Sequence, residues 1–298
     1  MGFNNDLALE ARELASANTG RIEGVSNIQR KVGDFSVTEI TIENEKGSRT
    51  LEKPCGKYIT VEMPEEVQES MAISVISQEL LRILPKKCGR VLVIGLGNEN
   101  VTPDALGPEA VKSIVVTRHL KEDLEEIFER NAVSTVSALA PGVMGQTGIE
   151  SAEIIKSLIN CIKPDTVITV DALCARRLSR LARTVQITDT GIKPGSGIGN
   201  TRAELSKTTL GIPVIAMGIP TVVSATTLTA DIMTVLSGEE GKRDEIYKAV
   251  EEKMGLSLFV TPKEIDSVVS DCARIMAMAI NTALHRGFTN EEMEQMLI

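Results

Sequence analysis

Aromatic side chains are scarce in this sequence of 298 residues: they make up 2% of it, and tryptophan is absent. A protein that binds nucleic acid by stacking bases on aromatic rings is therefore not expected. The net charge of −9 supports the same exclusion, because a surface that binds phosphates needs an excess of positive charge. An acidic surface is instead suited to attracting a basic protein as partner or substrate.

Long apolar stretches, paired cysteines and histidines are scarce as well. No apolar stretch reaches about 18 residues, so no membrane helix is expected, and the N-terminus lacks the pattern of a secretion signal. The five cysteines include no CxxC pair, which is typical of reduced thiols in an intracellular protein. With only His119 and His285 and no HExxH motif, a conventional zinc hydrolase is disfavoured. We expect a cytoplasmic protein without a metal or another cofactor.

Apolar residues, 42% of the sequence, form runs that alternate between strand-like and helix-like spacing. Compact apolar runs predict strands at 90–95, 133–139, 166–171, 184–188 and 213–218. Helical spacing predicts helices near 108–130, 149–162, 173–182 and 201–210, with two more at 224–237 and 262–284. This alternation is typical of a mostly parallel sheet with helices on both faces. We predict a single α/β domain with a three-layer α/β/α architecture.

The N-terminal part has a different pattern. The segments FSVTEITIE (35–43) and KYITVEM (57–63) alternate β-branched with polar residues, which predicts half-buried strands. ENEKGS (43–48) between them predicts a turn, so we expect an antiparallel β-hairpin beside the main sheet. A helix is expected over 65–84, because Pro64 suits a helix start and Pro85 a helix stop.

Polar, glycine-rich loops follow several predicted strands. They are GNENVTPDALGP (97–108), SALAPGVMGQTGIE (137–150), VDALCARR (170–177) and TDTGIKPGSGIGNTR (188–202). If the strands are parallel, several of these loops meet at one edge of the sheet, where ligands and chemistry collect in such folds. Asp104 and Asp171 would then approach each other, and Asp189 is a third acid at a strand end.

Two neighbouring carboxylates can hydrolyse a peptide bond without a covalent intermediate. Their mutual repulsion raises one pKa, so that the pair holds one proton near neutral pH. One carboxylate can then deprotonate water while the other protonates or polarises the carbonyl. The competing interpretation, which position alone favours, is that Asp104 and Asp171 cap the helices that follow them or turn their loops.

The glycine-rich loops also supply candidates for contact with substrate. These candidates are Gly97, Asn98, Asp189, Gly195 and Ser196. The run GSGIGN (195–200) ahead of a predicted helix could hold an anion with backbone N–H groups, and a flexible turn explains it equally well. The motifs GxGxxG and GxxxxGK[ST] are both absent.

Several long segments resemble the germination protease family, the endopeptidases that degrade small acid-soluble spore proteins when bacterial spores germinate. The matching segments are GLGNENVTPDALGP, VTRHL, SALAPGVMGQTGIES, VDALCARR, DTGIKPGSGIGNTR, LGIPVIAMGIPTVVSATT and TPKEIDSVVSDCARIMAMAINTALH. They lie in the same order as in the family and span about Arg90 to His285, with weaker likeness in DLALEARELA and KYITVEM.

The resemblance implies a fold similar to that of the hydrogenase maturation proteases and an atypical aspartic protease whose two acids fall on Asp104 and Asp171. In the metal-binding relatives the corresponding acids bind a metal together with a histidine. Neither histidine here lies in the loops expected to supply that ligand, so a metal-free carboxylate pair is favoured. The resemblance also implies a homotetramer in the spore core, with small acid-soluble spore proteins as substrates.

The family is made as a zymogen that removes a short N-terminal segment by self-cleavage. The matching bond here is Asp6–Leu7, an acid followed by an apolar residue. The resemblance therefore implies a propeptide at 1–6 and a protease domain at 7–298.

Two other functions remain open from the sequence. The same acids, with Asp189 or a loop carbonyl, could serve a metal-dependent hydrolase. The glycine-rich loops could instead belong to a non-catalytic module that binds an anion or a peptide.

Overall fold

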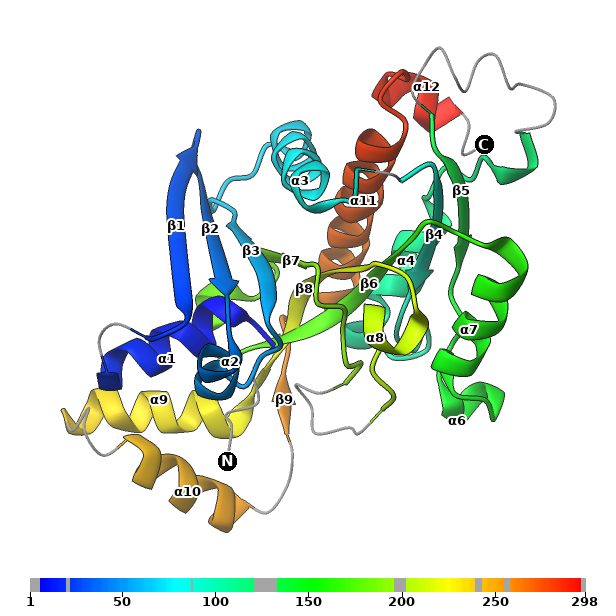
Figure 1. Ribbon diagram of the computed structural model, residues 1–298. Coiled ribbons are helices and arrows are strands. Elements are labelled where there is room, and N and C mark those ends of the chain that lie inside the picture. The colour runs from blue at the N-terminus through cyan, green and yellow to red at the C-terminus, as the bar shows by residue number, and fades with distance from the viewer. Residues whose placement is uncertain are drawn as a thin grey trace.

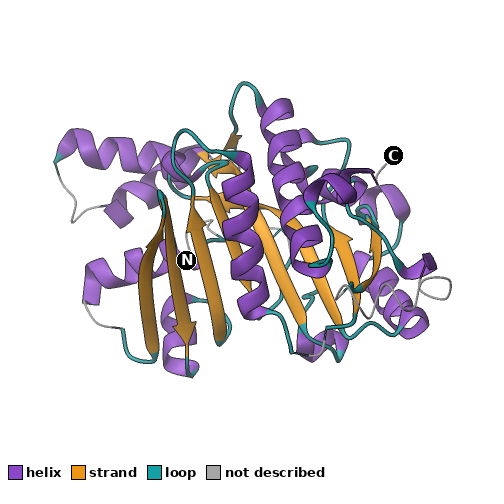
Figure 2. Cartoon of the chain, turned by 90° about the horizontal axis from the view of Figure 1, so that it is seen from above, coloured by secondary structure: helices purple, strands orange, loops and turns teal. Residues whose placement is uncertain are grey.

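The computed structural model describes residues 6–19, 22–86, 88–120, 133–195, 202–238, 243–254 and 258–295. Within these residues one nine-stranded sheet runs through the molecule in the order β1-β2-β3-β7-β8-β6-β4-β5, with β9 paired to β8 (Figures 1 and 2). Four neighbouring strands are parallel: β8 (Val214–Ser224), β6 (Thr166–Ala175), β4 (Arg90–Gly95) and β5 (Thr135–Leu139). The predicted mostly parallel core is confirmed.

The main differences from the predicted elements lie next to the parallel strands. The helix predicted at 173–182 is wrong, because β6 continues to Ala175 and only a short 3₁₀ turn, η3 (Leu178–Arg180), follows. The residues after Asp171 stay in the strand because β8 pairs with them up to Val223. Two other predictions differ in length. Near the helix predicted at 108–130, α4 (Leu106–Lys112) begins two residues earlier and ends at Lys112, and α8 (Lys207–Leu210) covers only the end of the helix predicted at 201–210. Residues 121–132 and 201 lie outside the described ranges.

The N-terminal strands extend the same sheet. β1 (Val25–Val32), β2 (Phe35–Ile42) and β3 (Gly56–Glu62) form an antiparallel meander, and β3 joins the core through β7 (Thr184–Thr188), which is antiparallel to β3 and β8. The turn predicted at 43–48 is instead the start of α2 (Glu45–Leu51). Asn44 begins this helix, since its Oδ1 accepts the N–H of Gly47 at 3.1 Å.

Helices cover both faces of the parallel strands, as the three-layer prediction requires (Figures 1 and 2). Alternation along β4 explains this: Val91 and Val93 pack in the cluster under α3 (Glu69–Ile83), α4 and α11 (Ile265–Leu284), while Leu92 and Ile94 pack under α7 (Ser151–Ile162) and α8. Successive side chains of a strand point to opposite faces, so a strand buried on both faces is apolar throughout.

The other elements include the strand β9 and helices outside the layers just described, of which α1 packs on β2 and β3. They are α1 (Ala8–Thr19), η1 (Thr102–Asp104), η2 (Arg118–Leu120), α6 (Met144–Thr147), α9 (Ala225–Ser237), α10 (Arg243–Met254), β9 (Phe259–Val260) and α12 (Asn290–Gln295). No helix within the described ranges is both long and apolar enough to cross a membrane.

Candidate active site

The loop after β4 is shaped around Asp104. Gly97 has φ +118°, and a Cβ there would lie 1.9 Å from the carbonyl oxygen of Asp104, so only glycine fits. The next residue, Asn98, donates its backbone N–H to Oδ2 of Asp104 at 2.8 Å. Thr221 of β8 fixes the other side of the loop, since its hydroxyl donates to the carbonyl of Pro103 at 2.6 Å. The loop therefore holds the Asp104 carboxyl group in one place.

Asp171 lies inside β6 rather than after it. It is level with Gly218 of β8, and a Cβ on Gly218 would come within 2.6 Å of the Asp171 carbonyl oxygen. The residue is 4% exposed, and its Oδ1 accepts the N–H of Ala172 at 3.0 Å. A carboxyl group is thus buried where the two longest parallel strands meet.

The two acids are brought together by the close pairing of β4 with β6. Leu96 donates its N–H to the carbonyl of Val170 at 2.8 Å, which places Gly97 beside Asp171. Gly97 in turn touches the backbone of Asp104. The turn GLGN therefore connects two acids that are far apart in the sequence.

Burial acts on both acids, and the charge of Asp104 also acts on Asp171. The pKa of Asp171 is well above its ordinary value, first because burial disfavours the charged form and then because of the negative charges of Asp104 and Asp6. Burial also raises the pKa of Asp104, although the N–H of Asn98 and the positive charge of Arg202 oppose the rise. The pKa is therefore raised more at Asp171 than at Asp104.

Neither acid caps a helix. The N-cap of α4 is Ala105, which offers no side-chain hydrogen bond, and no α-helix follows Asp171. Asp104 does stabilise its own loop through Asn98, so the turn-forming part of the competing interpretation applies to it.

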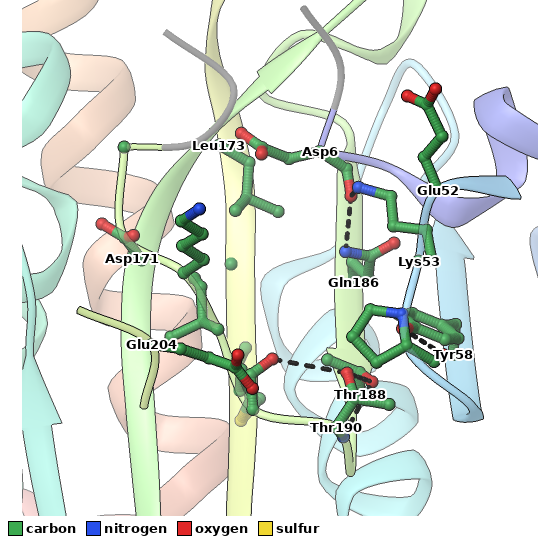
Figure 3. A pocket seen from close by; sticks show the side chains of 18 residues that line it. Asp6, Glu52, Lys53, Tyr58, Asp171, Leu173, Gln186, Thr188, Thr190 and Glu204 are labelled. Atoms are coloured by element: carbon green, nitrogen blue, oxygen red, sulfur yellow. Dashed lines mark hydrogen bonds between the residues drawn. The ribbon is translucent and has the colours of Figure 1, made fainter. Parts of the chain in front are cut away.

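A pocket of about 220 Å³ lies beside Asp171 (Figure 3). Its walls include Asp6, Lys53, Gln186 and Gly195, and Asp104 is not one of the residues that line it. This volume is enough for several water molecules, each of which occupies about 30 Å³ in the liquid. Gly195 is thus the loop candidate placed in the pocket wall.

The other loop candidates are placed differently. Asp189 is exposed and does not line the pocket; its Oδ1 accepts the N–H of Lys57 at 2.8 Å. Because β7 is antiparallel to β8, its carboxyl end points to the opposite edge of the sheet from that of β6, so the expectation of parallel strands does not extend to Asp189. Gly97 and Asn98 support Asp104, and Ser196 lies outside the described residues.

The proposed cleavage bond lies at the same pocket. The N–H of Asp6 donates to the carbonyl of Cys174 at 3.0 Å, and the N–H of Cys174 donates to Oδ2 of Asp6 at 2.9 Å. Leu7 is 0% exposed and packs in a cluster with Leu173 and Val223. The N-terminal segment therefore pairs with the end of β6, three residues beyond Asp171.

Three polar residues near the acids were not identified from the sequence: Lys53, Gln186 and Arg202. Gln186 had a visible signal, because it is a polar residue in the middle of the apolar strand TVQIT. Arg202 closes the glycine-rich loop and its charge acts on both acids. Lys53 lies between α2 and β3, and no pattern in the sequence connects it to the site.

Comparison with known proteins identifies the family. A model of the germination protease family matches residues 4–242 and 231–296. The chain belongs to the germination protease family. It is 44% identical to the germination protease of Caldanaerobacter subterraneus subsp. tengcongensis, over 100% of this chain and 98% of the relative. The germination proteases of Clostridium perfringens strain 13 (41%; 98% of both chains) and Geobacillus sp. strain WCH70 (36%; 94% and 93%) are similar over comparable lengths. The resemblance inferred from the loops is confirmed, and the chain is an endopeptidase.

One solved structure with a distant similarity is that of a hydrogenase maturation protease. The [NiFe] hydrogenase maturation protease HycI from Thermococcus kodakarensis KOD1 is 18% identical with a TM-score of 0.36, and the match covers 69% of this chain and 98% of that one.

The histidines and the acids do not form an evident metal site. Among the described residues, no group of three or more His, Cys, Asp or Glu side chains is arranged to hold a metal ion. His119 is exposed in η2, and His285 is buried at the end of α11, where its Nε2 hydrogen-bonds the carbonyl of Val115 at 3.0 Å. His285 is the C-cap residue of α11.

Proposed function

We propose that this germination protease degrades small acid-soluble spore proteins in the spore core with a carboxylate pair, Asp104 and Asp171. One observation carries the mechanism: a fully buried Asp171 whose pKa is raised by burial and by the negative charge of Asp104. Two carboxyl groups in this relation hold one proton between them, which is what water activation without a metal requires. The net charge of −9 also suits basic substrates.

The charges assign the roles. Asp104, the more exposed acid and the one whose pKa is raised less, is the base that removes a proton from water as the water oxygen attacks the carbonyl carbon. Asp171, whose pKa is raised well above its ordinary value, retains its proton and donates a hydrogen bond towards the reacting carbonyl. In its neutral form it adds no second negative charge beside that of Asp104. The proton taken by Asp104 then goes to the leaving nitrogen, so that the pair ends with the protons it began with.

We propose further that residues 1–6 are a propeptide removed by cleavage of Asp6–Leu7, which leaves 7–298 as the protease domain. The position of this bond supports the proposal, because Asp6 and Asp171 line the same pocket. Assembly into a homotetramer is supported by the apolar surface of α9, where Val235 is 80% and Leu236 82% exposed.

Asp104→Asn and Asp171→Asn test the mechanism. Each variant is expected to fold and to lose both self-cleavage and cleavage of a purified small acid-soluble spore protein, followed by mass spectrometry and gel electrophoresis. Asp189→Asn provides the comparison with an exposed acid that bonds the N–H of Lys57. Cleavage at the normal rate by both single variants of the pair would disprove the carboxylate mechanism.

A further inference from the structure

The carbonyl oxygen of Asp6, which belongs to the bond proposed for self-cleavage, accepts two hydrogen bonds. The ammonium group of Lys53 donates to it at 3.0 Å, and Nε2 of Gln186 donates to it at 3.0 Å. Figure 3 shows Asp6 above the pocket, with Asp171 on one side of it and Lys53 on the other. One carbonyl oxygen is thus held by one charged and one neutral donor, at a pocket that also contains a buried acid.

Gln186 is held in a fixed orientation. It lies in the middle of β7, level with Gly218 and therefore with Asp171, and it is buried. Its Oε1 accepts the N–H of Ala8 at 2.7 Å while its Nε2 donates to Asp6. The side chain therefore holds the chain on both sides of the Asp6–Leu7 bond and fixes the peptide that lies between.

Lys53 brings positive charge to the same oxygen. Burial lowers the pKa of its ammonium group, and the negative charges of Asp6, Glu10 and Glu52 oppose that fall. Burying an ammonium group is costly, and a backbone carbonyl in its ordinary state is satisfied by a neutral donor. A charged donor contributes most when negative charge develops on the oxygen, as it does during hydrolysis.

We propose that Lys53 and Gln186 form the oxyanion site of this protease: they hold the carbonyl oxygen of the bond that is cut. The inference rests on the proposed function, since it takes Asp6–Leu7 as the bond and Asp104 with Asp171 as the acids. One pair of acids has one geometry of attack, so the carbonyl of a substrate bond must reach the same two donors. Both residues then act in self-cleavage and in cleavage of substrate.

The reaction step balances as follows. Asp104 takes a proton from water, the water oxygen bonds to the Asp6 carbonyl carbon, and the C=O π electrons move to the oxygen that Lys53 and Gln186 hold. When the C=O bond re-forms, the C–N bond to Leu7 breaks and the nitrogen takes the proton from Asp104. The products are the new carboxyl group of Asp6 and the new amine of Leu7.

Cleavage itself would free the site for substrate. The new amine of Leu7 becomes charged at neutral pH, yet Leu7 is 0% exposed in an apolar cluster and Lys53 is close by. Burying this charge among apolar side chains and close to a second positive charge is unfavourable, so the new N-terminus is expected to leave. The acidic and apolar residues of a substrate then take the places of Asp6 and Leu7.

The test uses the full chain with Lys53→Met, Lys53→Arg and Gln186→Met. Lys57→Met and Gln29→Met are matched controls, because both side chains are on the exposed part of the meander. Self-cleavage is followed by mass spectrometry, and kcat and KM for a small acid-soluble spore protein are expressed per molecule that has lost residues 1–6. Asp171→Asn is measured beside them.

Loss of an oxyanion donor typically lowers kcat by about 10²–10³-fold. We expect losses of this order for Lys53→Met and Gln186→Met, mainly in kcat and in the self-cleavage rate, with partial recovery in Lys53→Arg and none of the loss in the controls. Normal rates in both Met variants, or a loss confined to KM, would overturn the oxyanion site. If Asp171→Asn itself cleaves normally, the proposed function fails instead.

Discussion

Gly97→Ala is the sharpest test of how the chain positions Asp104. The added Cβ would lie 1.9 Å from the Asp104 carbonyl oxygen and 3.4 Å from its Cγ, at a residue with φ +118°. The obstacle is backbone, which cannot rotate away, and the N–H of Asp104 is already bonded to the carbonyl of Val101 at 2.7 Å. Either the loop moves or the β4 end moves, and each displaces the carboxyl group.

The magnitude follows from the two costs involved. Overpacking and a strained backbone conformation each typically cost about 1–3 kcal/mol, so we expect a loss of about 2–6 kcal/mol in the free energy of unfolding. A displacement of about 1 Å in a catalytic group lowers the rate by about 10²-fold. The variant is therefore expected to lose both stability and cleavage activity.

The assay is urea unfolding followed by circular dichroism, together with the rate of spore-protein cleavage under conditions where the variant is folded. Gly145→Ala, in α6, is the matched control, since a Cβ there meets nothing within 4 Å. If Gly97→Ala unfolds and cleaves like the control, the close contact between the GLGN turn and Asp104 does not position the acid.

Three further predictions concern charge. The pKa of Asp171 is raised in the folded protein, so its contribution to stability is complete below its unfolded pKa and is lost as pH rises through the folded pKa. Asp171→Asn should therefore become more stable relative to the unchanged protein as pH rises. Urea unfolding at several pH values measures this difference. Arg202 lowers the pKa of both acids, so Arg202→Met should move the acidic limb of the pH–rate profile to higher pH, whereas exposed Arg49→Met should not. Activity should survive exhaustive chelation, because the described residues contain no group of three or more suitable ligands; loss that added zinc reverses would instead support a metal-dependent hydrolase.

The strands of the parallel core were predicted well, because strands buried on both faces consist of continuous apolar runs that are visible in the sequence. The strand predicted at 184–188 has those bounds in the structure, and the one at 90–95 does as well. The segment after Asp171 was predicted as a helix, since ALCARRLSR contains good helix formers. Pairing with β8 overrides that preference, and this pairing involves residues about 50 positions away, which local spacing does not report.

The site shows the same division. Glycines and acids after the predicted strands indicated the position of the candidate active site, because sharp turns require glycine and loops often carry functional residues. The sequence did not predict that Gln186 and Lys53 belong to the site. Gln186 lies in the antiparallel strand β7 and Lys53 in the segment before β3, and both reach the site only because these segments contact the N-terminal residues in space.

The sequence by itself predicted the layered α/β architecture, the family and the candidate acids Asp104 and Asp171, because each is encoded in short segments and their order. Only the tertiary structure decided that Asp171 is a buried strand residue, that Asp189 faces away from the pocket, and that the Asp6 carbonyl lies between Lys53 and Gln186. The physical reason is that burial, charge coupling and hydrogen bonding depend on distances in space. Pairing of the strands sets those distances between residues far apart in the chain.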